Sequence, residues 1–432
     1  MKNIQPCRCL RGSVQPPGDK SIAHRYAMIG AIASGDTLLF NYPAGRDVHS
    51  TLSCLRQLGV PVETQGTEVR IEGRGLHGLK ASHQPLDVGN SGTTIRLLSG
   101  ILAGQPFRTC LQGDESIARR PMRRIIAPLR QMGASIEARE GSFTPLEIRG
   151  GGLQGIDFQP QTPSAQVKSC VMLAGLYARG ITRVFEPVAT RNHTELALGH
   201  FGAALHADGA RIEVQPGKEM RGVTMHIPGD ISSAMFWIVG ALIRPGSEVI
   251  LENVGLNPSR DAVLRLLARW GAPIEIQPSM QTGMEVAGSL TVRYSDRLGR
   301  REPLEVQPED VPLMIDEIPA LAILGAHVPC GMKIRGAEEL RVKESDRLKA
   351  LAENLQRMGA AVSETTDGLD IEGGRTLHGS DIRTFGDHRI AMAFTIAALA
   401  ADSPVALDDP GCAAVSYPDF YEHLQALAGQ TA

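Results

Sequence analysis

The sequence Leu129-Arg130-Gln131-Met132-Gly133 reads as a helix end that runs into glycine, and a short predicted strand follows it. Glycine ends a helix readily because it adopts a positive φ without a side-chain clash. The same pattern recurs at 55–59, 200–202, 267–271 and 355–359. A repeated structural unit is therefore the starting point for predicting the fold.

A second pattern gives the repeat its length. A helix rich in small residues breaks and leads into a strand at 29–39, 98–111, 173–185, 238–251, 321–334 and 396–407. The spacing is about seventy residues, and segments such as 69–73, 146–150 and 369–373 alternate apolar and charged residues as half-buried strands do. We therefore predict an α/β protein of six similar units, three in each half, with a boundary at 225–230 and a site between the halves.

The composition excludes several classes of protein. The 432 residues carry 44 Lys+Arg against 47 Asp+Glu, a net charge of −3, and only 4% are aromatic, which argues against a general nucleic-acid binder. The longest uncharged apolar run, 390–401, is about 12 residues, whereas a bilayer span needs about 20. Residues 1–12 lack the apolar core of a secretory signal. Seven scattered cysteines are typical of free thiols in a reducing cytoplasm, and neither Cys7 nor Cys9 has a partner pair at zinc spacing.

Cations stand at predicted helix starts, where they are unfavourable. Short polar residues that cap helices, among them Asp19, Ser91, Ser164 and Asp387, precede apolar stripes. Several cations lie in or near these first turns: Lys20, Arg25, Arg347 and Arg389. A cation there costs about 0.3–1 kcal/mol against the helix dipole. If these N-termini meet, the cations and Arg120 would form a basin for a ligand that carries phosphate and carboxylate groups.

Other interpretations of these segments remain open. Residues 343–347 could be a solvated charged face, residues 119–124 a basic surface patch, and Asp387 a cap followed by a surface pair. Asp316, in an apolar stretch that opens a helix, could be an N-cap or a general base. Glu344 stands beside Lys343, and if Glu344 and Asp316 face one cleft they form a candidate acid–base pair.

The combination of motifs resembles one family. The segments Pro17-Gly18-Asp19-Lys20-Ser21-Ile22-Ala23-His24-Arg25, Gly89-Asn90-Ser91-Gly92-Thr93 with Arg96, Arg341-Val342-Lys343-Glu344-Ser345-Asp346-Arg347-Leu348 and Asp387-His388-Arg389-Ile390-Ala391-Met392-Ala393 are similar to signatures of the EPSP (5-enolpyruvylshikimate-3-phosphate) synthases. The likeness extends over about 12–421. It implies a two-domain inside-out α/β (enolpyruvyl transferase) fold of six βαβαββ units with the site in the interdomain cleft. The expected domains are 18–230, and 1–17 with 231–432.

The resemblance also implies a reaction. The family transfers the enolpyruvyl group of phosphoenolpyruvate to the 5-hydroxyl of shikimate 3-phosphate and releases phosphate. Residues that match shikimate 3-phosphate contacts are Lys20, Ser21, Arg25, Ser164, Ala165, Gln166, Arg191, Asp316 and Lys343. Residues that match phosphoenolpyruvate contacts are Lys20, Gly92, Arg120, Gln166, Arg347 and Arg389. The implied catalytic residues are Asp316, which takes the hydroxyl proton, Glu344, which protonates the methylene carbon, and Lys20.

The same resemblance sets expectations about ligands and partners. We expect a cytoplasmic monomer that uses the two small-molecule substrates without a cofactor or metal, and that binds neither nucleic acid nor membrane. Because Gly92 leaves room beside phosphoenolpyruvate, we expect its mimic glyphosate to compete. Two positions depart from the family pattern: Val415 replaces a usual lysine, and Glu339 replaces a frequent asparagine.

Two rival functions remain at this point. A UDP-N-acetylglucosamine enolpyruvyl transferase would share the fold, but that family usually carries a catalytic cysteine where counting back from Arg120-Pro121 gives Glu115. A non-catalytic six-unit scaffold could bind a phosphorylated metabolite or RNA and would need neither Asp316 nor Glu344, although the net charge of −3 argues against RNA.

Overall fold

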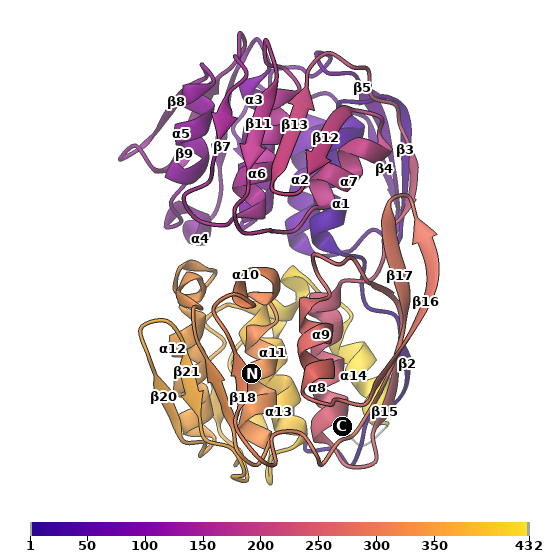
Figure 1. Ribbon diagram of the computed structural model, residues 1–432, viewed down its shortest axis with the longest axis vertical. Coiled ribbons are helices and arrows are strands. Elements are labelled where there is room, and N and C mark those ends of the chain that lie inside the picture. Colours follow the sequence, from indigo (N-terminus) through magenta and orange to yellow (C-terminus); the bar gives the residue numbers. More distant parts are fainter. Residues whose placement is uncertain (1, 430–432) are drawn as a thin grey trace. The chain divides into compact units, whose positions relative to one another are not determined.

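The computed structural model describes residues 2–429, which pack as two compact units (Figure 1). We call residues 18–227 with 281–285 the N-terminal unit, and the remaining described residues the C-terminal unit. Each unit has its own hydrophobic core. The short segment 281–285 belongs to the N-terminal unit although it lies between two stretches of the C-terminal unit.

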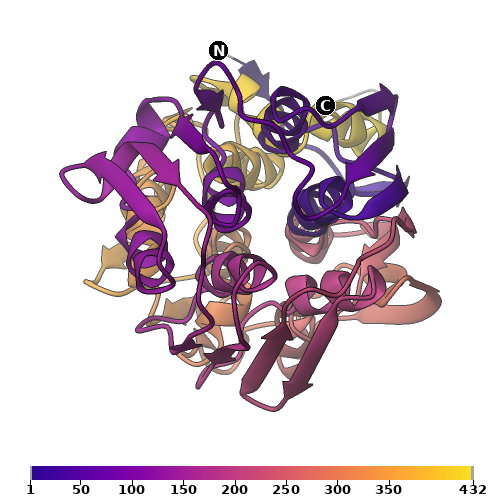
Figure 2. The same cartoon turned by 90° about the horizontal axis from the view of Figure 1, so that it is seen from above.

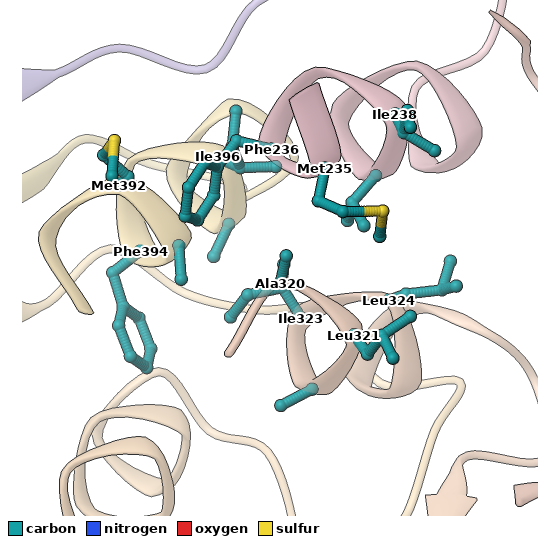
Figure 3. Close-up of a cluster of buried hydrophobic side chains, with 14 of the residues drawn as sticks. Met235, Phe236, Ile238, Ala320, Leu321, Ile323, Leu324, Met392, Phe394 and Ile396 are labelled. Atoms are coloured by element: carbon teal, nitrogen blue, oxygen red, sulfur yellow. The ribbon is translucent and has the colours of Figure 1, made fainter. Parts of the chain in front are cut away.

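Apolar helices form the centre of the C-terminal unit. These helices are α8 (Ile231–Ile243), α11 (Ile318–His327) and α13 (His388–Leu399). Apart from His388 and Arg389 at the start of α13 and His327 at the end of α11, their residues are apolar or small, and a helix of that kind is stable only when it is buried all round. They pack against one another, and Figure 3 shows side chains of the three helices meeting, among them Met235, Ile323 and Ile396.

The N-terminal unit is built in the same way around α1 (Lys20–Ala31), α3 (Gly92–Ala103) and α6 (Ala165–Gly175). Helix α3 packs against both α1 and α6. A Cβ atom on Gly100 would lie only 2.2 Å from the carbonyl oxygen of Cys170, so glycine is what allows α3 and α6 to approach this closely. In Figure 2 the helices of this unit, drawn in indigo to magenta, are seen nearly end-on with strands around them.

Small sheets cover the helices of each unit. In the N-terminal unit their strand orders are β14 (Thr224–His226)-β3 (Ser34–Phe40)-β5 (Glu68–Arg74)-β4 (Val62–Gln65), β6 (Leu86–Asp87)-β7 (Arg108–Gln112)-β9 (Phe143–Arg149)-β8 (Ser135–Arg139) and β10 (Asp157–Phe158)-β11 (Thr182–Phe185)-β13 (Arg211–Gln215)-β12 (Ala204–Asp208). In each sheet the first two strands pair in parallel and the remaining pairs are antiparallel. This repeated topology agrees with the repeat predicted from the sequence.

The C-terminal unit repeats this plan with the help of the chain's first strands. Its strand orders are β2 (Arg11–Val14)-β15 (Glu248–Gly255)-β17 (Glu285–Arg293)-β16 (Ile274–Thr282), β18 (Leu304–Val306)-β19 (Met332–Ile334)-β21 (Leu369–Ile371)-β20 (Val362–Glu364) and β22 (Asp381–Ile382)-β23 (Val405–Leu407)-β1 (Lys2–Ile4). Strand β2 pairs in parallel with β15, and β1 pairs antiparallel with β23. Over residues 2–429 there are thus six sheets, and the predicted α/β repeat fold is confirmed.

The units contain further helices besides these central ones. They are α2 (Arg46–Gln57), α4 (Glu115–Ala118), α5 (Arg123–Gln131), α7 (His193–His200), α9 (Ala262–Arg269), α10 (Val311–Met314), α12 (Arg347–Arg357) and α14 (Phe420–Ala428), with 3-10 helices η1 (Glu338–Val342) and η2 (Pro410–Val415). In the part of the chain that the structure describes, no helix has the length and apolar character needed to cross a bilayer.

The glycines predicted to end helices do so by the expected mechanism. Each adopts a positive φ: Gly59 at 82°, Gly133 at 109°, Gly202 at 83°, Gly271 at 80° and Gly359 at 88°. A side chain would be strained at each of these positions because L-residues rarely adopt this conformation. The prediction from the recurring pattern is therefore confirmed.

Candidate active site

In the N-terminal unit, Arg25 joins helices α1, α6 and α7. Arg25 is buried in α1, and its Nε donates to the Thr194 hydroxyl at 2.7 Å while NH2 donates to the Ser169 hydroxyl at 2.9 Å. A third donor, NH1, reaches the carbonyl of Ser21 at 2.8 Å. Thus one guanidinium holds α1, α6 and α7 together through neutral oxygen atoms.

The charges around Arg25 affect its pKa. Burial is the largest cause, and it lowers the pKa of Arg25 to about 10, while the carboxylate of Glu195 opposes the shift and the like charge of Arg191 adds to it. Arg191 is half-buried in the segment that precedes α7. Two guanidinium groups that repel each other in this way form a place where an anion would be stabilised.

Lys20 lies in the first turn of α1. The caps predicted from the sequence are present: the Asp19 carboxylate accepts from the amide of Ile22 at 3.0 Å, and Ser164 caps α6 at Val167. Lys20 is the first residue of α1, and its Nζ lies 2.9 Å from Oδ2 of Asp47 on α2. The Asp47 carboxylate thus offsets the unfavourable position of the Lys20 ammonium at a helix N-terminus. This role of Asp47 was not identified from the sequence.

A glycine, an amide and two arginines meet where α3 and α6 begin. Gln166 donates to the Thr93 hydroxyl at 2.9 Å and accepts from Arg96 NH1 at 2.8 Å. A Cβ atom on Gly92 would stand 2.8 Å from Arg96 NH1 and 3.0 Å from Arg120 NH1. Gly92 therefore leaves the space that these two guanidinium groups occupy, and Ala165 and Ser164 lie beside Gln166 at the start of α6.

A chain of hydroxyls connects α1 with the start of α3. His24 Nδ1 lies 2.7 Å from Oγ1 of Thr51, which lies 2.7 Å from Oγ1 of Thr94, and Thr94 donates to the Ser91 hydroxyl at 2.8 Å. Burial lowers the pKa of His24 well below its ordinary value, and the charges of Lys20 and Arg25 add to this effect. A neutral His24 thus helps to fix α3 relative to α1.

In the C-terminal unit, Arg347 is surrounded by carboxylates. It is 1% exposed at the start of α12; its Nε donates to Oδ2 of Asp387 at 2.8 Å, and NH2 donates to Oε2 of Glu344 at 2.6 Å. Burial by itself would raise the pKa of Asp387, but Arg347 holds it below the ordinary value. The same carboxylate caps α13 through the amide of Arg389 at 2.9 Å and accepts from Ser345 at 3.0 Å.

Three cations converge on Asp316. Its Oδ1 lies 3.6 Å from Arg347 NH1, 3.9 Å from Arg389 Nε and 4.0 Å from Lys343 Nζ. Arg389 NH1 also donates to the backbone carbonyl of Asp316 at 2.9 Å, which brings α13 to the segment that opens α11. Asp316 is not the cap of α11, because that position belongs to Glu317.

The open interpretations of the charged segments are decided by burial. Residues 343–347 are not a solvated face, because Arg347 is buried among acidic partners. Residues 119–124 are not only a surface patch, because Arg120 is buried although Arg119 is exposed. Arg389 is also buried, so Asp387 is not a cap followed by a surface pair.

The predicted site residues therefore gather in two sets. The N-terminal unit brings together residues at or near the starts of α1, α3, α6 and α7 with one arginine that follows α4, namely Lys20, Ser21, Arg25, Gly92, Ser164, Ala165, Gln166 and Arg191 with Arg120. The C-terminal unit brings together Asp316, Lys343, Glu344, Arg347 and Arg389. Sequence reasoning missed Ser169 and Thr194, and it assigned Asp387 only a capping role, because hydrogen-bond and ion-pair partners distant in sequence leave no local pattern.

The positions that depart from the family pattern have other surroundings. Val415 is buried at the end of η2, and Tyr417, two residues later, accepts from the indole of Trp237 at 3.0 Å. Glu339 is half-buried in η1. Glu115 begins α4 and is paired with Arg119 at 3.2 Å on the surface. Among residues 2–429, no cluster of His, Cys, Asp or Glu could hold a metal ion, and the cysteines form no disulfide.

Comparison with known proteins identifies the family. The sequence profile of EPSP synthase (3-phosphoshikimate 1-carboxyvinyltransferase) matches residues 4–424. The chain is 49% identical over 427 residues to the 3-phosphoshikimate 1-carboxyvinyltransferase of Solibacter usitatus, covering 99% of both chains. It is 48% identical over 419 residues to the enzyme of that name from Shouchella clausii, covering 97% of this chain and 96% of the other.

Solved structures agree with this result. The EPSP synthase of Acinetobacter baumannii superimposes with a TM-score of 0.87 at 40% identity, covering 98% of this chain and 97% of the other. The enolpyruvyl transferase NikO of Streptomyces tendae, at 19% identity and a TM-score of 0.79 over 98% of this chain and 96% of the other, shares the fold. The chain therefore belongs to the EPSP synthase family, whose members are small-molecule transferases that move the enolpyruvyl group of phosphoenolpyruvate to the 5-hydroxyl of shikimate 3-phosphate in the shikimate pathway.

Proposed function

We propose that the two sets of site residues bind one pair of substrates and divide the work between them. In this proposal the set around Arg25 holds the phosphate of shikimate 3-phosphate, with Lys20, Ser21 and Arg191 near it. Hydroxyls and guanidinium groups of this kind bind phosphate well, since each N–H or O–H donor is directed at an anionic oxygen. The further contacts that we assign to this substrate are Ser164, Ala165, Gln166, Asp316 and Lys343.

We assign phosphoenolpyruvate to the arginines of both sets. Its contacts would be Lys20, Gly92, Arg120, Gln166, Arg347 and Arg389. The observation that carries this assignment is Arg347: within the described residues its buried NH1 has no hydrogen-bond partner and lies 3.6 Å from Asp316 Oδ1. A buried donor of this kind costs free energy unless a ligand oxygen satisfies it.

The acidic residues of the C-terminal unit would move the protons. Asp316 takes the proton of the 5-hydroxyl as its oxygen bonds to the central carbon of phosphoenolpyruvate, and Glu344 delivers a proton to the methylene carbon. The central carbon is cationic as this proton arrives. When phosphate leaves, the methyl carbon returns a proton to the Glu344 carboxylate and the product double bond forms. Lys20 and the arginines stabilise the departing phosphate, which requires a preorganised site with little water.

Substrate binding to variants tests the assignment of substrates to residues. Replacing Arg25 by Lys should weaken shikimate 3-phosphate by about tenfold in calorimetry, because a lysine cannot keep the fork to Ser169 and Thr194. An exposed arginine of the same unit, Arg119, provides the matched control as Arg119→Lys. Unchanged affinity in the Arg25 variant would refute the placement of the phosphate.

We also propose that the enzyme works as a cytoplasmic monomer that does not bind nucleic acid. Free cysteines throughout the described residues are typical of a reducing compartment, and the net charge of −3 gives little attraction for a polyanion. Sedimentation analysis of the purified protein would show one species of about the chain's mass, 46.3 kDa, and a dimer would contradict the proposal.

A further inference from the structure

A buried ion-pair cluster, which we call the Lys168 cluster, lies behind Arg25 and consists of Lys168, Glu186, Thr190 and Glu195. The side chain of Lys168 is 0% exposed, and its Nζ lies 2.8 Å from Oε2 of Glu186 and 2.8 Å from Oε1 of Glu195. The Thr190 hydroxyl donates to the other oxygen of Glu186. All four residues are buried, and none of them carries a role in the reaction described above.

The cluster is interleaved with the partners of Arg25. Lys168 precedes Ser169 on α6, and Glu195 follows Thr194 on α7. The Ser169 and Thr194 hydroxyls lie 2.6 Å apart, so the two helices are joined by a pair of neighbouring contacts, one ionic and one between hydroxyls. The ionic contact therefore fixes the spacing of the two hydroxyls that receive the Arg25 guanidinium.

The same lysine also fixes the loop that carries Arg191. Glu186 follows β11 directly, and its amide donates to the carbonyl of Ala210 at 2.8 Å. Its carboxylate contacts Lys168 on one side and Thr190 on the other, which closes the loop at the residue before Arg191. An arginine after such a closed turn has a defined backbone position, which reduces the conformational entropy lost when it binds an anion.

We propose that the Lys168 cluster is a positioning device for phosphate recognition: it places Arg25 through Glu195, and Arg191 through Glu186 and Thr190. The inference rests on the proposed function, because it takes the ligand of both arginines to be the phosphate of shikimate 3-phosphate. Lys168 touches no substrate in this account. It acts only through the residues that do.

The test compares shikimate 3-phosphate with shikimate, which lacks the phosphate. The dissociation constant of shikimate divided by that of shikimate 3-phosphate, both measured by calorimetry, isolates recognition of the phosphate. In Thr190→Val, which removes one hydrogen bond to a charged group without burying a new charge, this ratio should fall by about tenfold while the affinity for shikimate is unchanged. Lys168→Met should lower the ratio further. This variant leaves two buried carboxylates without their ammonium partner, so it can fail to fold. In that case Thr190→Val decides the question.

Thr182→Val provides the matched control. Thr182 is also buried, at the start of β11, and among the described residues its hydroxyl has no hydrogen-bond partner, so its removal should leave the ratio at the wild-type value. A wild-type ratio in folded Thr190→Val, or an equal loss of affinity for both ligands, would overturn the positioning role and leave the proposed function standing. If the wild-type protein itself shows no preference for the phosphorylated ligand, the proposed phosphate site fails and this inference fails with it.

Discussion

The arginines of the two site sets are surrounded in different ways. In the N-terminal unit Arg25 and Arg96 are held mostly by hydroxyls, an amide and carbonyls, which orient a guanidinium without neutralising it. In the C-terminal unit Arg347 is held by Asp387 and Glu344 and lies close to Asp316. Neutral partners leave the charge of Arg25 available to an anion, whereas the carboxylates around Arg347 place proton-transfer groups beside the cations that we assign to phosphoenolpyruvate.

The largest effect should come from the carboxylate at the centre of the C-terminal set. We expect Asp316→Asn to lower turnover by about 100-fold or more, because the amide cannot accept the hydroxyl proton, while shikimate 3-phosphate binds within a few-fold of wild type. Phosphate release in the steady state and calorimetry measure the two quantities. Asp310→Asn, at the paired surface carboxylate beside Arg269, is the control. Turnover near the wild-type value in Asp316→Asn would show that this carboxylate is not the base.

A second variant tests whether Arg347 binds phosphoenolpyruvate rather than shikimate 3-phosphate. Arg347→Lys keeps the charge but loses the two-pronged contact with Asp387 and Glu344, so we expect the KM for phosphoenolpyruvate to rise by about thirtyfold. The KM for shikimate 3-phosphate should change much less. Initial rates with each substrate varied in turn give both values. The opposite ranking would contradict the assignment of Arg347.

A substitution at Gly92, which lies beside Arg120, tests how much space the N-terminal set leaves for a ligand. A methyl group in Gly92→Ala would approach Arg96 NH1 at 2.8 Å and Arg120 NH1 at 3.0 Å, so the arginines must shift. We expect the KM for phosphoenolpyruvate and the inhibition constant of glyphosate to rise by about tenfold, the cost of one displaced charged hydrogen bond. An inhibition constant for glyphosate that is unchanged in this variant would show that the mimic binds away from Gly92.

One buried group from each unit, His24 and Asp387, should also respond to acid in a different pH range. A buried neutral His24 has a pKa below that of the unfolded chain, so it contributes stability above pH of about 6.5 that is lost as the pH falls, by at most about 1.4 kcal/mol per pH unit. The depressed pKa of Asp387 contributes stability that is lost only at lower pH, below about 3.9. Between these two pH values, the free energy of unfolding of His24→Asn, measured with denaturant, should change less with pH than that of the wild type. A slope equal to that of the wild type would mean that His24 does not contribute.

These contrasts also separate what the sequence could predict from what it could not. Gly133 and its counterparts were predictable because a helix end followed by a positive φ needs glycine at one defined position. The caps at Asp19 and Asp387 were predictable because capping is local. The neighbours of the cations were not: Asp47 neutralises Lys20 from another helix, and nothing in the sequence around Asp47 indicates it.

Residues close in space but far apart in the sequence account for most of what was missed at the site. Ser169 and Thr194 hold Arg25 from two helices that follow much later in the chain. The prediction of an acid–base pair at Asp316 and Glu344 came from residue type and local charge, and the structure adds that both lie within reach of Arg347. Several charged residues are plausible site residues from local sequence alone, and only the packed structure shows which of them lie close together.

One measurement tests most directly whether a single ligand is shared by arginines that belong to different units. Arg120→Lys alters the N-terminal set and Arg389→Lys alters the C-terminal set. With shikimate 3-phosphate present, the dissociation constant of phosphoenolpyruvate should rise by about tenfold in each variant. Wild-type affinity in either one would mean that phosphoenolpyruvate is held by one unit alone.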